Sequence, residues 1–158
     1  MTGNHLFDTK QMFRHACAFA NCADFCREDD LYIDHIKPRI VNSAFACEIF
    51  LKSLLYYHGI EYGKKHDLEA LFHLLPECYQ ETIERELYKQ YGKTENAFGI
   101  SYLSNISKAF ETWRYSFEKS QLQIEIGFLY TFRDVLRELC CHEYYHVTWK
   151  DYLRRNDV

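Results

Sequence analysis

The chain has 158 residues, of which 47% are hydrophobic and only two are proline, so it is long enough to bury one core without metals or disulfide bonds. Its formal net charge of −4 gives no overall positive field that would attract a nucleic-acid backbone or an anionic membrane, so any contact with nucleic acid has to be local. Because the sequence has no apolar signal segment and no unbroken apolar run of membrane length, we expect a single cytoplasmic domain over residues 1–158.

The first predicted helix covers residues 9–27. Apolar residues recur along it at near-helical spacing and predict its buried side: Met12, Ala16, Phe19, Ala20, Ala23 and Phe25 or Cys26. None of the seven cysteines forms a CxxC pair, so we expect reduced thiols that behave as small hydrophobic residues, and we expect Cys17, Cys22 and Cys26 on this helix to lie in the core.

A second helix is predicted over residues 38–58. Pro38 is tolerated in a first helical turn, and Gly59 is a favourable C-terminal stop. The apolar residues of this segment cover an arc wider than a surface helix requires, so we expect the helix to lie at the centre of the fold.

A short helix and a solvated helix are predicted next. His66 or Asp67 can cap the short one, whose apolar residues are spaced i, i+3, i+4 and i+7: Leu68, Leu71, Phe72 and Leu75. Pro76 is expected to end it. A charged and mostly solvated helix follows over residues 77–90, and residues 91–99 are predicted to form a loop.

Two further patterns complete the predicted fold. Ser101 is predicted to cap a helix with a core-facing stripe: Leu103, Ile106, Phe110, Trp113 and Phe117. The last helix is predicted over residues 122–151. These segments predict an all-α, up-and-down helical bundle of four long helices with a short fifth element. The aromatic content of 17% is high for a small monomer to bury, so we expect a homodimer.

Two opposite charges fall inside the apolar arc of the second predicted helix. Glu48 and Lys52 are four residues apart on one face, and an unpaired charge there would cost several kcal/mol of desolvation. Arg114 and Glu118, an i, i+4 pair on a later helix, are the predicted partners. This pairing is open to a structural interpretation, in which the ion pairs fix the register of two helices.

The alternative interpretation of the same charges is a ligand or phosphate pocket. In that case His66 and Tyr115 are expected at the rim of the pocket. A separate match, His142-Glu-Tyr-Tyr-His146, places two imidazoles one helical turn apart with a glutamate between them, as in zinc hydrolases. A third zinc ligand would have to come from Asp151 or from an upstream residue, so we favour a protein without metal or other cofactor.

Three segments resemble, in their order and spacing, the HEPN superfamily (higher eukaryotes and prokaryotes nucleotide-binding). They are NSAFACEIFLKSLLYYHG at residues 42–59, HDLEALFHLLPE at 66–77 and WRYSFE at 113–118. The resemblance implies a bundle of four or five helices and frequent homodimers. It also implies roles as ribonucleases, RNA-binding modules, toxins or components of phage defence, with partners such as a nucleotidyltransferase antitoxin.

Catalytic HEPN proteins carry an arginine followed after four to six residues by a histidine, and they cleave RNA without metal. The histidine would act as general acid or base on the 2′-hydroxyl, and the arginine would stabilise charge on the phosphate. Arg114 has no histidine at this spacing. Arg137 and His142 match it with four residues between them, yet on one continuous helix their side chains point about 140° apart.

The sequence therefore favours a HEPN-type accessory or defence-related domain that binds RNA, a nucleotide or a partner protein. The alternative is a toxin-like, metal-independent endoribonuclease that uses Arg137 with His142, or Arg114 with a histidine from elsewhere. A zinc hydrolase is the third hypothesis.

Overall fold

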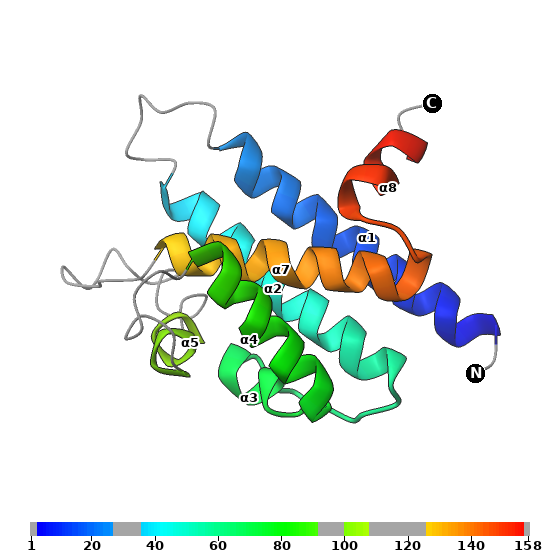
Figure 1. Ribbon diagram of the computed structural model, residues 1–158, viewed down its shortest axis with the longest axis horizontal. Coiled ribbons are helices and arrows are strands. Elements are labelled where there is room, and N and C mark those ends of the chain that lie inside the picture. The colour runs from blue at the N-terminus through cyan, green and yellow to red at the C-terminus, as the bar shows by residue number, and fades with distance from the viewer. Residues whose placement is uncertain (1–2, 27–35, 92–99, 108–125, 157–158) are drawn as a thin grey trace.

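The computed structural model describes residues 3–26, 36–91, 100–107 and 126–156, and this part of the chain contains helices and no strands (Figure 1). The helices are α1 (Gly3–Phe25), α2 (Ile36–Tyr57), α3 (Leu68–Phe72), α4 (Glu77–Tyr91), α5 (Ile100–Ser107), α7 (Ile126–Tyr145) and α8 (Trp149–Asn156). The prediction of an all-α helical bundle is confirmed, and the long helices of the described part of the chain are α1, α2, α4 and α7.

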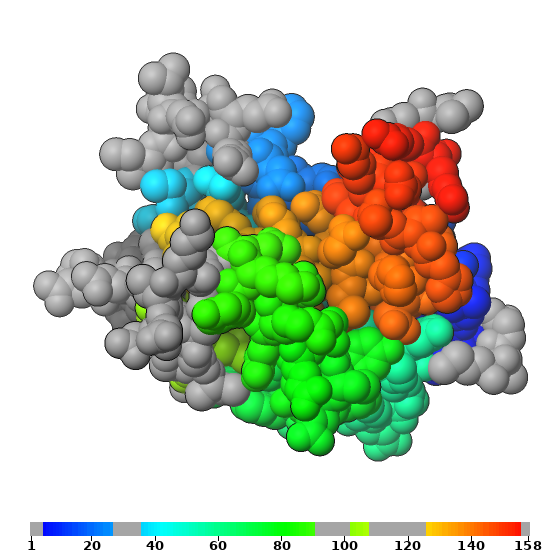
Figure 2. All heavy atoms as spheres, in the orientation of Figure 1, coloured from blue at the N-terminus to red at the C-terminus, as the bar shows by residue number. Residues whose placement is uncertain are grey.

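Helix α2 lies at the centre, as its wide apolar arc predicts. It packs along α1 and contacts α7 and α3, while α7 also contacts α1, α4 and α8. Figure 2 shows α4 covering part of α7 on one face, with the rest of α7 at the surface between α4 and α8. The residues of α2 that are buried are Ile40, Ser43, Ala44, Ala46, Cys47, Glu48, Phe50, Leu51, Ser53, Leu54 and Leu55.

The buried side of α1 differs in part from the predicted one. Ala16, Ala20 and Ala23 are buried as expected, but Phe25 is 80% exposed and the fully buried aromatic residue is Phe13. The cysteines are likewise buried in some positions and exposed in others. Cys17, Cys47, Cys140 and Cys141 are buried, whereas Cys22 and Cys78 are exposed, so the expectation that Cys22 lies in the core is wrong.

The predicted last helix is divided into α7 and α8. Helix α7 ends at Tyr145, and His146 adopts a left-handed conformation with φ 56° that a continuing helix does not allow. Helix α8 then begins with its own cap, because the backbone N–H of Asp151 donates to Oγ1 of Thr148 at 3.2 Å. The chain therefore turns at residues 146–148, and α8 packs back against α7.

The start of α5 also differs from the prediction. Ser101 was expected to cap this helix, but the helix begins at Ile100, so Ser101 lies inside its first turn. Leu103 and Ile106 of the predicted stripe are buried. The other three residues of that stripe, Phe110, Trp113 and Phe117, lie outside the described residues.

Asp67 caps α3, as one of the two predicted alternatives, and ties it to α5. Its Oδ1 accepts hydrogen bonds from the backbone N–H of Ala70 at 2.8 Å and from Oγ of Ser107 at 2.6 Å. The Ser107 hydroxyl oxygen in turn accepts from the backbone N–H of Glu69 at 2.9 Å. One carboxylate therefore holds the beginning of α3 and the end of α5 together.

Replacing Asp67 by alanine is expected to lower the free energy of unfolding by about 1–2 kcal/mol, because α3 loses its cap and Ser107 loses its acceptor. Urea unfolding followed by circular dichroism measures this loss. Asp67→Asn keeps an acceptor oxygen and should cost clearly less. A loss below about 0.5 kcal/mol in Asp67→Ala would show that the cap does not stabilise the fold.

Candidate functional site

Glu48, Lys52 and His66 form a polar cluster at the C-terminal half of α2, which we call the Glu48 cluster. Oε1 of Glu48 accepts a hydrogen bond from Nζ of Lys52 at 2.7 Å and lies 2.9 Å from Nδ1 of His66. The Glu48 side chain is 5% exposed and that of Lys52 is 14% exposed, whereas His66 is largely at the surface. Two elements build the cluster, because Glu48 and Lys52 are one turn apart on α2 and His66 lies in the loop before α3.

Two charges are tolerated within the apolar arc of α2 because the members of this cluster compensate one another. The ammonium group of Lys52 compensates the Glu48 carboxylate directly, and His66 brings a second polar group to the same oxygen. The His66 contact also fixes the α2–α3 loop against α2. The other predicted members of this site, Arg114, Tyr115 and Glu118, lie outside the described residues, so their pairing with Glu48 and Lys52 stays a prediction.

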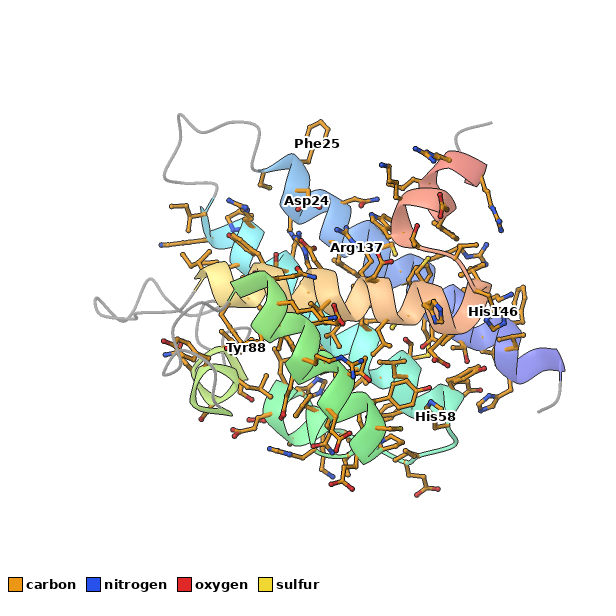
Figure 3. All side chains as sticks on the ribbon, in the orientation of Figure 1. Asp24, Phe25, His58, Tyr88, Arg137 and His146 are labelled. Atoms are coloured by element: carbon orange, nitrogen blue, oxygen red, sulfur yellow. The ribbon has the colours of Figure 1, made fainter. Side chains whose placement is uncertain are left out.

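Arg137 belongs to a second charged cluster, where α7 meets α1. Its Nη2 lies 3.0 Å from Oδ1 of Asp134, and its Nη1 lies 3.6 Å from Oδ2 of Asp24 on α1 (Figure 3). The guanidinium carbon is 4.7 Å from the ring centroid of Trp149, which is the first residue of α8. Only 11% of the Arg137 side chain is exposed, so this arginine joins α1, α7 and α8.

Arg133 completes this second cluster and was not predicted. Its Nη2 lies 2.7 Å from Oδ1 of Asp24 and 2.8 Å from Oδ1 of Asp134, and Nη1 donates to Oγ of Ser43 at 3.2 Å. Burial by itself lowers the pKa of Arg133, but attraction to the carboxylates of Asp134 and Asp24 raises it more, so the pKa lies above its usual value. The sequence did carry a signal, because Arg133 falls between Leu129 and Leu136 on the apolar face of α7.

An open depression of about 380 Å³ lies where the start of α1 meets the end of α2. It is lined by His5, Tyr56, Gly59, Ile60, Glu61, Tyr62 and Gly63. The rings of His5 and Tyr56 are stacked, with centroids 4.1 Å apart and planes inclined by 9°. The Tyr62 ring links the depression to the Glu48 cluster, because its centroid is 5.5 Å from Nζ of Lys52. The sequence did not predict this surface.

The family model of the HEPN domain matches residues 27–138, which is more than half of the chain. This chain belongs to the HEPN domain family. The match includes α2 to α5 and most of α7, which leaves α1, the end of α7 and α8 outside it. No curated protein and no solved structure matches the chain. The resemblance seen in the sequence is thus confirmed.

The arginine and histidine that match the catalytic HEPN spacing are not brought together by α7. This helix is continuous over Arg137 and His142, so no kink rotates the two side chains toward each other. Arg137 faces Asp24 and Trp149, whereas His142 is exposed to solvent. The HEPN match itself includes Arg137 and ends before His142. In the described part of one chain, Arg137 and His142 therefore lie in different surroundings.

The two histidines of the HExxH match do not lie on one helix in this HEPN chain. His142 lies in the last turn of α7, but His146 lies beyond the end of the helix with its positive φ. Among residues 3–26, 36–91, 100–107 and 126–156, no group of three or more His, Cys, Asp or Glu side chains is arranged to hold a metal ion.

None of the helices in the described part of this HEPN chain combines the length and the apolar character that crossing a membrane requires.

Proposed function

We propose that this HEPN domain is a binding module for ligands that carry a nucleobase and a phosphate, namely RNA or a nucleotide, and that it does not cleave them. The observation that carries the proposal is the environment of Arg137. Its guanidinium group is held by the carboxylates of Asp24 and Asp134, and His142 points to another side of α7. Metal-independent cleavage needs both groups on one phosphate.

The choice of ligand is supported by the loop between α2 and α3. The Glu48 cluster holds this loop through His66, and the loop presents the ring of Tyr62 followed by the exposed ammonium groups of Lys64 and Lys65. Aromatic faces next to positive charges are the features with which proteins bind single-stranded RNA and nucleotides. The overall negative charge of the chain does not oppose this, because such contacts are local.

Incubation of the purified protein with a mixed pool of single-stranded RNA is expected to show retention of RNA on a filter and no shorter products on a gel. The Arg137→Ala/His142→Ala double variant loses the ion pairs of Arg137, so circular dichroism first checks that it is folded; the folded variant is then expected to behave as the wild type in both measurements. Fragments with 2′,3′-cyclic phosphate ends that form in the presence of a chelator, and that the double variant does not make, would overturn the proposal. If the protein retains neither RNA nor a nucleotide, the proposal is also overturned, and a protein ligand is favoured.

The runner-up is a metal-independent endoribonuclease assembled by two copies of the chain. The observation that favours it is the spacing of Arg137 and His142, which matches the catalytic HEPN pattern. In a homodimer, the histidine of one copy would have to approach the arginine of the other. We propose a homodimer and a cytoplasmic location on the grounds given by the sequence, and a nucleotidyltransferase is the proposed partner if the domain acts in a toxin-antitoxin pair. Light scattering after size-exclusion chromatography measures the oligomeric state.

A further inference from the structure

We propose that the depression between the start of α1 and the end of α2 binds a guanine base, with the attached phosphate directed toward Lys64 and Lys65. This inference rests on the proposed binding of RNA or nucleotides and names the base and its site.

The shape of the depression suits one flat ring system. Its volume of about 380 Å³ lies within the range of small-ligand sites, and most of its lining is aromatic or backbone. Gly59 and Gly63 both have positive φ, at 68° and 57°, a conformation that favours glycine. A Cβ atom at either position would meet no atom within 4 Å, so the backbone of the loop stays open to a ligand there.

The aromatic side chains around the depression are held in place before a ligand arrives. The stack of His5 on Tyr56 fixes both rings, and the Tyr56 hydroxyl donates to Oδ2 of Asp8 at 3.3 Å. On the other side, the Tyr62 ring is half-buried near the ammonium group of Lys52, which Glu48 holds. Rigid aromatic faces of this kind favour stacking of a base, because little conformational entropy is lost on binding.

Glu61 supplies the selectivity for guanine. It carries the one carboxylate among the residues that line the depression, and it is exposed. An ionised carboxylate only accepts hydrogen bonds. Guanine presents two adjacent donors on its Watson–Crick edge, the N1–H and the N2 amino group, which a carboxylate can accept together. Adenine and cytosine present an amino group next to an acceptor nitrogen, and uracil presents one N–H between two carbonyl oxygens. These three bases therefore place lone pairs against Glu61.

The two lysines that follow the lining residues along the chain favour an anionic ligand over an organic cation. Tyrosine faces with a glutamate could also attract a cation through cation–π contacts. However, Lys64 and Lys65 follow directly after Gly63 and are both exposed. Two exposed ammonium groups directly after the lining residue Gly63 disfavour a cation and attract a phosphate. The arrangement of base site, carboxylate and lysines thus fits a guanine nucleotide or a guanine within single-stranded RNA.

Isothermal titration calorimetry with GMP, AMP, CMP and UMP tests the proposal. GMP is expected to bind about tenfold more tightly than AMP, since the carboxylate accepts from two donors of guanine and faces a lone pair of adenine. Glu61→Gln should weaken GMP binding by about tenfold and remove its advantage over AMP. Glu84→Gln, at an exposed position of α4, is the matched control and should leave both affinities unchanged.

A second pair of variants tests the stacking face. Tyr62→Ala should weaken the binding of all four nucleotides, whereas Tyr62→Phe keeps the ring and should retain binding, with circular dichroism confirming that both fold. Single-stranded oligonucleotides with and without guanine then distinguish RNA from a free nucleotide as the source of the base. Tighter binding of the oligonucleotide than of GMP would identify RNA as the ligand.

Three outcomes would overturn the assignment of this site. They are equal affinity for all four nucleotides, a preference for GMP that survives Glu61→Gln, and tighter binding of the cation agmatine than of GMP. RNA binding that is unchanged in both Glu61→Gln and Tyr62→Ala would place the RNA elsewhere on the protein, so that this inference fails and the proposed function stands. Absence of any binding to nucleotides and RNA would remove both.

Discussion

Replacing Phe13 by alanine is expected to lower the free energy of unfolding by about 4 kcal/mol, the largest effect of a single substitution that we expect here. Phe13 is fully buried on α1 and contacts rings from three other helices, with centroid separations between 5.6 and 6.3 Å. These rings belong to Phe50, Tyr144, Tyr145, Trp149 and Tyr152. The variant would leave a cavity where α1, α2, α7 and α8 meet.

Guanidinium unfolding followed by circular dichroism measures this loss. Phe7 lies on the same helix and is 59% exposed, so Phe7→Ala is the matched control and should change the stability by less than about 0.5 kcal/mol. Phe13→Leu refills part of the space and should give an intermediate loss. If Phe7→Ala and Phe13→Ala cost the same, α1 does not present the described side to the core.

The buried side of α1 could be predicted only in part. The alanines are buried as predicted, but Phe13 is absent from the predicted set, and Phe25, one of the two alternatives at the end of the helix, is exposed. Phe13 lies three, seven and ten residues before Ala16, Ala20 and Ala23, so the helical period does place it on their side. What the pattern does not show is the set of rings around Phe13, which includes Trp149 and Tyr152 of α8 as well as Phe50 of α2. The sequence pattern had joined α8 to α7, so the contact with α8 could not be anticipated.

The break between α7 and α8 left a local signal that the prediction did not use. The apolar pattern continues across residues 146–148 without glycine or proline, which favours one long helix. Thr148, however, is followed three residues later by Asp151, and their side chains are hydrogen bonded at 2.8 Å. A threonine with an acidic residue at this spacing is typical of a helix N-terminus.

Part of the candidate site could be predicted from local sequence, and part depends on contacts between distant segments. Glu48 and Lys52 were found because two charges within an apolar arc are a local anomaly in the sequence. The depression near Tyr62 depends on the start of α1 reaching the end of α2, which brings His5 to Tyr56 across about fifty residues of chain. No periodicity within either segment predicts that contact. The pairing of Asp24 with Arg133 is likewise a contact between distant helices.

Replacing Glu48 by alanine is expected to lower the free energy of unfolding by about 3 kcal/mol. The reason is that Lys52, whose side chain is 14% exposed, would retain its charge without the carboxylate 2.7 Å away, and His66 would lose its contact with α2. Urea unfolding measures the loss. Glu84→Ala, at an exposed position of α4, is the control and should cost less than about 0.5 kcal/mol. A loss of similar size in both variants would show that the Glu48 carboxylate is not needed to compensate a buried charge.

A double variant separates the structural interpretation of the Glu48 cluster from the ligand-binding one. Glu48→Gln/Lys52→Met replaces both charges by uncharged side chains of similar size, so it should recover most of the stability that either single substitution loses. RNA binding is then measured on a folded protein. If the double variant binds RNA as the wild type does, the cluster acts only by holding the α2–α3 loop. If it is stable and no longer binds RNA, the charges themselves contact the ligand, and the structural interpretation fails.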